Sequence, residues 1–183
     1  MAQQGRATPA EGTDERDEAV AVRLLKTPIG VVQIAASDTK LLGIELPRRR
    51  AERGFQRGLR NRLLGHHETA VLSAALLQLR EYFAGRRRAF ELPVDPAGTE
   101  FQRRVWREVA TIPYAETVSY GSIAAAIGAP HLARAVGAAV RANPIPIVIP
   151  CHRVIGADGS LTGYSAGLRR KVWLLRHEGV LLA

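Results

Sequence analysis

A proline-rich stretch from residue 143 to 154, NPIPIVIPCHRV, constrains this chain more than any other feature. It holds Cys151, the only cysteine in 183 residues, directly after Pro150 and before His152. Pro150 fixes its own φ and biases the residue before it towards an extended conformation. We therefore predict that the apolar run 147–149 is strand-like and that the thiol lies where this run ends. A thiol held rigidly beside an imidazole suits a nucleophile. The alternative is a buried cysteine that acts as a small hydrophobic residue.

The composition is that of an ordinary globular protein, with 46% apolar and 23% charged residues. A lone cysteine excludes an internal disulfide and argues against a cysteine-rich zinc site, so no metal is expected. No apolar run approaches the roughly 20 residues that cross a bilayer, and the polar N-terminus lacks the apolar segment of a signal peptide. These features predict a cytoplasmic protein that does not bind a membrane.

The formal net charge of +9 is unevenly distributed. Residues 1–20 hold two arginines against five acidic residues, so the positive charge is concentrated in the rest of the chain. Such a balance favours a polyanionic partner such as nucleic acid, although a solvated basic surface explains it too. Residues 1–18 are predicted to be a disordered tail. The cationic stretch 48–62 is either a phosphate-binding segment or a solvated face.

Residues 19–85 are predicted to form an α/β domain. Three short apolar runs separated by turn residues indicate an antiparallel meander, over residues 19–25, 30–36 and 41–46. Apolar residues at helical spacing then predict a helix from His67 to Phe83, which Gly85 ends. Prolines and glycines in residues 86–98 indicate a linker to a second domain.

Residues 99–183 are predicted to form the second, mainly helical domain. Thr99 and Gln102 have the spacing of a capping box, which opens a helix that ends before Pro113. Ser119 is expected to cap a helix over residues 120–127, and Pro130 to open the next one, which runs to Arg141. Two short helices joined through a glycine turn are typical of a helix-turn-helix.

The second of these helices, residues 130–141, is amphipathic. Its apolar face holds Leu132, Val136, Ala139 and Val140, and its opposite face holds Arg134, Gly137, Ala138 and Arg141. A basic face kept small in this way could approach a DNA groove closely. An ordinary amphipathic helix explains the apolar half equally well.

A last helix is predicted from Leu168 to Glu178, with Leu168, Val172 and Leu175 buried and Gly179 as its C-cap. Glu178 lies in the last turn, where a carboxylate opposes the helix dipole and needs a compensating partner. Either a surface salt bridge with Arg or Lys, or a histidine that donates to the carboxylate, would supply one.

Taken together, these motifs closely resemble the O6-alkylguanine-DNA alkyltransferases over nearly the whole chain. The matching motifs follow one another in the family's order: Thr27-Pro-Ile-Gly30, Phe101-Gln-Arg-Arg-Val-Trp106, Ile112-Pro-Tyr114, Ser119-Tyr-Gly121, Ala133-Arg-Ala-Val-Gly137, Asn143-Pro144, Pro150-Cys-His-Arg-Val154, Gly163-Tyr164, Arg170-Lys171, Leu174-Leu175 and His177-Glu178-Gly179. The resemblance implies an α/β N-terminal domain (a short antiparallel sheet plus a helix), followed by a mainly α C-terminal domain with a helix-turn-helix.

The resemblance also implies a reaction and its residues. Cys151 would accept the alkyl group, His152 would deprotonate it through a water, and Glu178 would orient the imidazole. Tyr120 would hydrogen-bond the guanine ring nitrogen. In the substrate site, the Ser165 backbone N–H would bond O6, and the carbonyls of Cys151 and Val154 would read the exocyclic amine. Tyr164, Lys171 and Asn143 would complete this site, and Asn143 would also fix the turn that links the recognition helix to the strand before the cysteine.

The implied partner is double-stranded DNA containing O6-alkylguanine, with O4-alkylthymine as a minor substrate. Arg134 would enter the base stack from the minor groove and fill the gap left by a flipped nucleotide. The other DNA-facing residues would be Ala133, Gly137, Arg141 and Ser119. Water does not readily release the alkyl group from the thioether product, so each protein molecule would act once. The protein would act as a monomer and without a cofactor.

Three other classes remain as alternatives. A non-catalytic lesion-binding relative would have lost the acceptor cysteine, and Cys151 is present. A helix-turn-helix regulator explains the charge but not the set Cys151, His152 and Glu178. A cysteine hydrolase lacks an evident oxyanion-hole pattern. One departure from the family concerns Ala166, where many relatives have glycine, and its methyl group would narrow the pocket for bulky alkyl groups.

Overall fold

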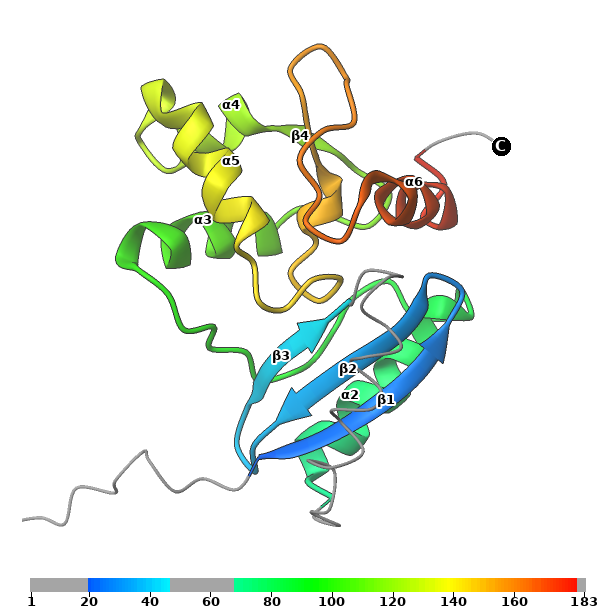
Figure 1. The fold of residues 1–183 in the computed structure, drawn as a ribbon. Helices are drawn as coiled ribbons and strands as arrows, with labels where there is room; N and C mark the ends of the chain where they lie inside the picture. The colour runs from blue at the N-terminus through cyan, green and yellow to red at the C-terminus, as the bar shows by residue number, and fades with distance from the viewer. Residues whose placement is uncertain (1–19, 47–67, 181–183) are drawn as a thin grey trace, which may run out of the picture.

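The computed structural model describes residues 20–46 and 68–180. The tail predicted for residues 1–18 and the cationic stretch 48–62 lie outside these residues. Within them, a small sheet with one helix is followed by a helical domain (Figure 1). The predicted fold class is confirmed.

The N-terminal domain is the predicted antiparallel meander. Strands β1 (Ala21–Thr27), β2 (Gly30–Ala36) and β3 (Leu41–Glu45) pair in the order β1-β2-β3. Helix α2 (Ala70–Phe83) covers one face of this sheet (Figure 1). Alternate residues of β2 and the apolar stripe of α2 are buried together as its core: Val32, Ile34, Ala36, Leu72, Ala75 and Leu79. The helix begins at Ala70 because the Thr69 side chain takes the N-cap position and accepts from Leu72 N at 3.0 Å.

The C-terminal domain contains four α-helices among its described residues. Its elements are α3 (Glu100–Ala110), β4 (Val118–Ser119), α4 (Tyr120–Ala126), η1 (Pro130–Leu132), α5 (Ala133–Arg141), η2 (Cys151–Arg153), β5 (Val154–Ile155) and α6 (Leu168–His177). The capping box at Thr99 and Gln102 is present. Trp106 is buried, and its indole N–H donates to the Ala139 carbonyl at 2.8 Å, which joins α3 to α5.

The segment before Cys151 is a turn, so the predicted strand at 147–149 is wrong. Ile147 has φ +79°, a left-handed conformation that costs a β-branched residue energy. Three prolines remove the backbone donors that a strand would need. Instead, Asn143 Nδ2 donates to Ile149 O at 2.8 Å and Asn143 Oδ1 accepts from Ile145 N at 3.0 Å. The Asn143 amide therefore closes a tight turn that delivers the chain to Cys151.

The buried face of α6 also differs from the prediction. Lys171, Leu174 and Leu175 point inward, whereas Leu168 is 49% exposed and Val172 is only half-buried. The amphipathic pattern misleads here because a lysine occupies the inner face. Its ammonium finds two carbonyl acceptors inside the protein, as described below.

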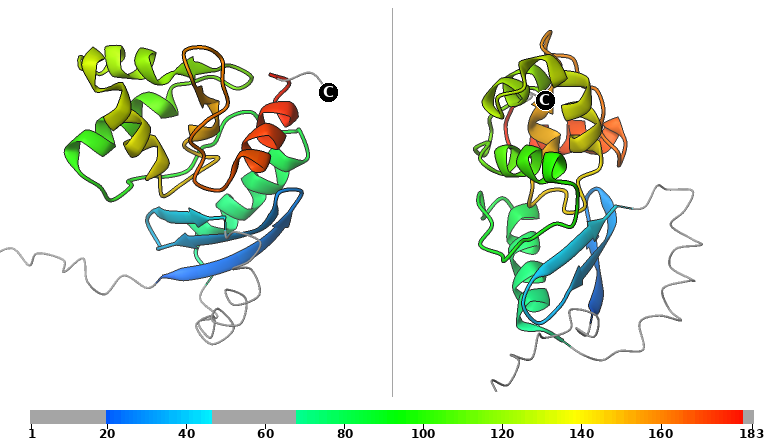
Figure 2. Two further views of the ribbon diagram at one scale, coloured as in Figure 1. Left: turned by 45° about the horizontal axis from the view of Figure 1, so that its top comes forward. Right: turned by 90° about the vertical axis from the view of Figure 1, so that its left-hand side faces the viewer.

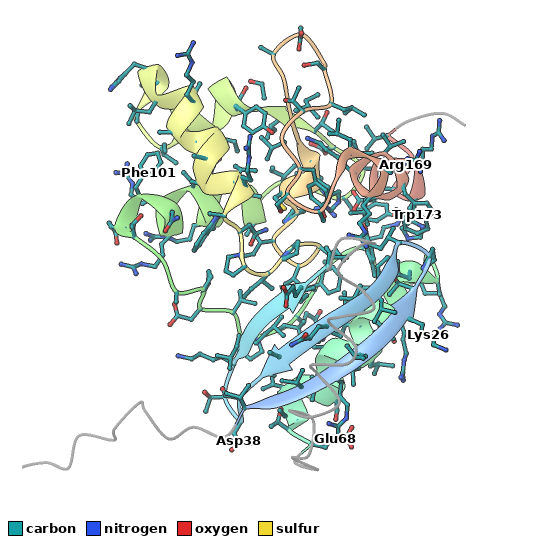
Figure 3. The ribbon with its side chains drawn as sticks, viewed as in Figure 1. Lys26, Asp38, Glu68, Phe101, Arg169 and Trp173 are labelled. Carbon is teal, nitrogen blue, oxygen red and sulfur yellow. The ribbon has the colours of Figure 1, made fainter. Side chains whose placement is uncertain are left out.

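The two domains meet along α6 and the turn at 143–150. The end of α2 lies beside α6 (Figure 2), and the His177 ring nitrogen is 2.7 Å from the Tyr82 carbonyl. Arg170 donates to Ile29 O at 2.8 Å. Trp173 lies on the side of α6 that faces the N-terminal domain (Figure 3). Strand β3 contacts the turn directly, because Ile44 N donates to Pro144 O at 2.9 Å.

Candidate active site

Cys151 and His152 lie in η2, and Glu178 is the C-cap of α6. His152 is fully buried, and Cys151 and Glu178 are 4% exposed. The imidazole Nε2 is 2.8 Å from Glu178 Oε1. Residues 26 positions apart are therefore joined into one buried cluster beside the only cysteine of the sequence.

Glu178 accepts hydrogen bonds from the two residues that follow Cys151, from the segment after α3 and from the other domain. Arg153 donates from Nε to Oε2 at 2.8 Å and from Nη2 to Oε1 at 3.0 Å. The Tyr82 hydroxyl donates to Oε1 at 2.7 Å, and Ala115 N donates to Oε2 at 3.3 Å. Burial alone would raise the pKa of this carboxyl group, but the bonds from His152 and Arg153 hold it well below its usual range.

These bonds decide which histidine nitrogen carries the proton. An ionised carboxylate only accepts, so His152 Nε2 is the protonated nitrogen and Nδ1 carries the lone pair. Burial lowers the pKa of His152, so the ring is neutral near pH 7. Nδ1 is buried and has no hydrogen-bond partner among the described residues. The ring thus presents a basic nitrogen inside the cluster.

Cys151 is a thiol in the resting protein. Burial raises its pKa to about 11, although hydrogen bonding from the Asn143 side chain and the charge of Lys171 oppose that shift. The nucleophilic form of cysteine is the thiolate, so this thiol needs a base when it reacts. The lone pair of the adjacent histidine is the base that the cluster offers.

Lys171 connects β5 to the loop that follows it. Its ammonium donates to Val154 O at 2.5 Å and to Thr162 O at 2.8 Å. Burial lowers the pKa of Lys171 to about 8, and the proximity of Cys151 opposes that shift. A carbonyl has two lone pairs, so Val154 O can accept a second donor besides Lys171.

Tyr120 lies against the same loop. Its hydroxyl donates to Thr162 O at 3.1 Å. Gly163 has φ +71°, and a Cβ at this position would lie 2.7 Å from the Tyr120 hydroxyl oxygen, so the close approach requires glycine. Two residues further on, Ser165 is exposed, and Tyr164 is buried with no hydrogen-bond partner for its hydroxyl among the described residues.

A groove of about 700 Å³ runs between α5 and this loop. It is lined by Tyr120, Ala133, Arg134, Gly137, Ala138, Arg141, Ala142, Thr162 and Gly163. The predicted faces of α5 are present, with Val136 buried against the core and both arginines exposed. Ser119 is not part of the groove lining. Its hydroxyl caps α4 and accepts from Ser122 N at 3.0 Å.

Ala166 lies elsewhere, in a cleft of about 700 Å³ between the domains, where the β1–β2 turn and the start of α6 form the walls. Among the described residues, no three His, Cys, Asp or Glu side chains are grouped as metal ligands would be. Over the same residues, the structure has no helix of the length and apolarity that crossing a membrane requires.

Comparison with known proteins identifies the family of the chain. The ribonuclease-like domain of 6-O-methylguanine DNA methyltransferase matches residues 20–96, and the DNA binding domain of the same enzyme matches residues 100–180. The chain belongs to the 6-O-methylguanine DNA methyltransferase family. A methylated-DNA–protein-cysteine methyltransferase of Mycolicibacterium paratuberculosis is 47% identical over 156 residues, which cover 85% of this chain and 90% of that relative. One of Shigella flexneri is 56% identical over 106 residues, covering 57% and 62%.

Solved structures of the family have the same fold. The O6-methylguanine methyltransferase of Mycobacterium tuberculosis superposes with a TM-score of 0.74 at 43% identity, covering 87% of this chain and 93% of that one. A structure of the M. tuberculosis protein in complex with DNA gives a TM-score of 0.73 at 42% identity, covering 86% and 92%. As a member of the family, this chain is a DNA repair methyltransferase that transfers a methyl group from O6-methylguanine to a cysteine.

Two members of the buried cluster were not found from the sequence. Arg153 stands inside the motif Pro150-Cys-His-Arg-Val154, but the spacing alone assigned it no role. Tyr82 falls within the helix predicted from His67 to Phe83, and the apolar spacing of that helix gave it no role in the site. A signal for Tyr82 existed, because a buried tyrosine hydroxyl normally needs a hydrogen-bond partner. The sequence does not show that this partner lies 96 residues away in the other domain.

Proposed function

We propose that Cys151 is the acceptor of the alkyl group and that His152 and Glu178 form its proton relay. The observation that carries this proposal is the Nε2–Oε1 bond of 2.8 Å in a fully buried pair next to the only cysteine. An ionised Glu178 fixes the ring so that the basic Nδ1 is available to the thiol through a water.

The proposed transfer is a displacement at carbon. The Cys151 sulfur attacks the alkyl carbon, an S–C bond forms, and the electron pair of the C–O6 bond passes to the guanine. The thiol proton moves through a water to His152 Nδ1. The imidazolium then releases it to water, and the guanine anion takes up one proton from water at its ring nitrogen, so that the products are a thioether and neutral guanine. The protein ends as a thioether, so each molecule acts once and needs no cofactor.

Donors around the base would stabilise the charge that guanine gains in the transition state. In the proposed complex, the Tyr120 hydroxyl turns from Thr162 O to the guanine ring nitrogen. Thr162 O keeps Lys171 as its donor, so this rotation leaves no carbonyl unpaired. The Ser165 backbone N–H is assigned to O6, and the carbonyls of Cys151 and Val154 to the exocyclic amine. Tyr164 and Asn143 complete this site.

The groove beside α5 is the proposed DNA-facing surface. O6 lies within the duplex stack, so the nucleotide must be flipped out to reach a thiol that is only 4% exposed. Arg134 is exposed on the outer face of α5 and is proposed to fill the vacated stack. Ala133 and Gly137 keep that face small, Arg141 contacts phosphate, and Ser119 holds the start of α4.

Several finer points belong to the same proposal. The acceptor thiol must stay reduced, so a reducing cytoplasm is the expected compartment. We expect a monomer that binds double-stranded DNA containing O6-alkylguanine, with O4-alkylthymine as a minor substrate. Ala166 directly follows Ser165, which is assigned to O6, and its methyl group is expected to limit the size of the alkyl group.

Intact-protein mass spectrometry tests the proposal. After incubation with duplex DNA containing O6-methylguanine, the wild-type mass should rise by one methyl group per molecule, and peptide mapping should place it on Cys151. Cys151→Ser, which keeps the shape of the site, should gain nothing. Turnover well beyond one lesion per protein molecule, or a methyl group on another residue, would contradict it.

A further inference from the structure

The carboxylate at the centre of the buried cluster receives one of its donors from the N-terminal domain. Tyr82 is the next-to-last residue of α2, and its side chain is fully buried. Its hydroxyl donates to Glu178 Oε1 at 2.7 Å, the shortest of the hydrogen bonds given above for this carboxylate. Figure 2 shows how the end of α2 reaches the end of α6, where Glu178 is the C-cap.

We propose that Tyr82 is a positioning residue of the proton relay: its hydroxyl fixes Glu178 and thereby sets the orientation and basicity of His152. This inference rests on the function proposed above. It makes the N-terminal domain a working part of the active site as well as a support for the C-terminal domain.

The ring and the hydroxyl of Tyr82 have separable roles. The ring packs against Phe83, Phe90, Tyr114 and His177 at centroid distances of 5.1 to 6.4 Å. A phenylalanine would keep these contacts, since they involve only the aromatic ring. The Tyr82 carbonyl, which faces His177 Nε2 at 2.7 Å, would also be unchanged. Only the bond to Glu178 depends on the hydroxyl.

That bond acts on the oxygen that also serves the histidine. Tyr82, His152 and Arg153 Nη2 all point at Oε1. Each donor withdraws part of the negative charge, so the loss of one makes Oε1 a stronger acceptor for the remaining donors. A stronger acceptor stabilises the imidazolium form of His152 and raises the pKa of His152. The carboxylate also loses one of the bonds that fix its position.

The other charged and titratable groups around Glu178 come from four segments. From η2 they are Arg153 and His152, and from the segment after α3 it is Tyr114. The guanidinium carbons of Arg153 and Arg88 lie 5.7 and 5.5 Å from the centroid of the Tyr114 ring. From α6 they are His177, the chain neighbour of Glu178, and Lys171, whose charge acts on His152. From α2 it is Tyr82. Burial holds the pKa of Tyr82 far above its ordinary value, so its hydroxyl remains a neutral donor at every working pH. Its contribution to the relay is therefore constant while His152 titrates.

The test is the pH profile of single-turnover transfer from duplex DNA containing O6-methylguanine, followed by the intact mass of the protein. In Tyr82→Phe, the midpoint of the acid limb should move to higher pH by about 0.5 to 1 unit, because the pKa of His152 rises. The rate on the plateau should fall several-fold, because the imidazole is held less firmly. Tyr114→Phe is the matched control. It removes a nearby hydroxyl that donates to the His177 carbonyl at 3.2 Å, and it should leave the midpoint in place.

A second variant tests the same idea without removing the hydrogen bond. Fluorotyrosine inserted at position 82 keeps the ring and makes the hydroxyl a stronger donor, so the acid limb should move to lower pH. The inference is overturned if the wild type reacts but neither variant moves the midpoint, even where Tyr82→Phe lowers the melting temperature. If the wild type itself gains no mass, the proposed function has failed instead.

Discussion

Glu178 and Arg134 belong to the same domain, but their surroundings are opposite. Glu178 is 4% exposed and accepts from four residues, two of them in the segment that holds Cys151. Arg134 is exposed on a groove whose other wall is the loop at 162–163. The buried cluster couples stability to chemistry, because removing one of its charged members leaves a buried partner unpaired. Substitutions on the exposed face of α5 leave no buried group unpaired, so they should change DNA binding without changing stability.

The largest expected effect lies in the buried cluster. Glu178→Gln removes the charge that faces the buried Arg153 guanidinium, and breaking a buried ion pair costs about 3–5 kcal/mol. We expect the free energy of unfolding, measured by urea denaturation, to fall by about this amount and the transfer to slow. The matched control is Glu100→Gln, which breaks exposed pairs with Arg103 and Arg107 at 3.1 and 3.3 Å. Its cost should stay within about 1 kcal/mol. Equal losses of unfolding free energy in the two variants would contradict the claim that the buried charges stabilise the protein more than the exposed ones do.

Low pH should destabilise the wild-type protein through the same buried cluster. The pKa of Glu178 is lower in the folded protein than in the unfolded chain, so its stabilising contribution is complete above about pH 4.5 and is lost as pH falls below that value. The pKa of His152 is also lowered by folding. The unfolded chain therefore binds the extra proton first, and stability already declines as pH falls below about 6.5. In Glu178→Gln the loss below pH 4.5 should be smaller than in the wild type.

A smaller effect, confined to DNA, is expected at Arg134. Arg134→Ala removes the side chain proposed to fill the vacated stack, which offsets an unstacking cost of a few kcal/mol. Repair of O6-methylguanine in duplex DNA should therefore fall strongly. Reaction with free O6-benzylguanine needs no flipping and should keep its rate, and the melting temperature should not change. An unchanged ratio of duplex to free-base rates would show that α5 meets the DNA in another way.

The sequence predicted most of what is local. The meander, the capping box at Thr99 and the two faces of α5 depend on neighbouring residues, and all are present. The strand predicted at 147–149 is wrong because the pattern shows apolar residues but not the Asn143 amide that closes a turn over them. The inner face of α6 was misassigned because hydropathy counts Lys171 as a surface residue, although two carbonyls hold it inside.

The site shows the same limit. The sequence placed Cys151 next to His152, and the helix dipole argument showed that Glu178 needs a partner. It left open whether that partner was an arginine or a histidine, and the structure shows both. Tyr82 could not be found in this way, since no local pattern connects the end of α2 to the end of α6. Contacts between domains depend on how the domains dock, and the periodicity of either domain's sequence does not predict this.

The smallest effect is expected at Arg141, at the C-terminal end of α5. It lines the same groove as Arg134 and is exposed, but no part of the buried cluster depends on it. We therefore expect Arg141→Ala to weaken binding to duplex DNA of every sequence, damaged or undamaged, by a similar factor. A lost phosphate contact should reduce the slope of log affinity against log salt by about 1. Arg134→Ala is the useful comparison, because a residue that occupies the base stack should change discrimination between damaged and undamaged duplex more than it changes the salt slope. A loss for Arg141→Ala that is confined to damaged DNA would make it a second stack-filling residue and would place the axis of the duplex differently along α5.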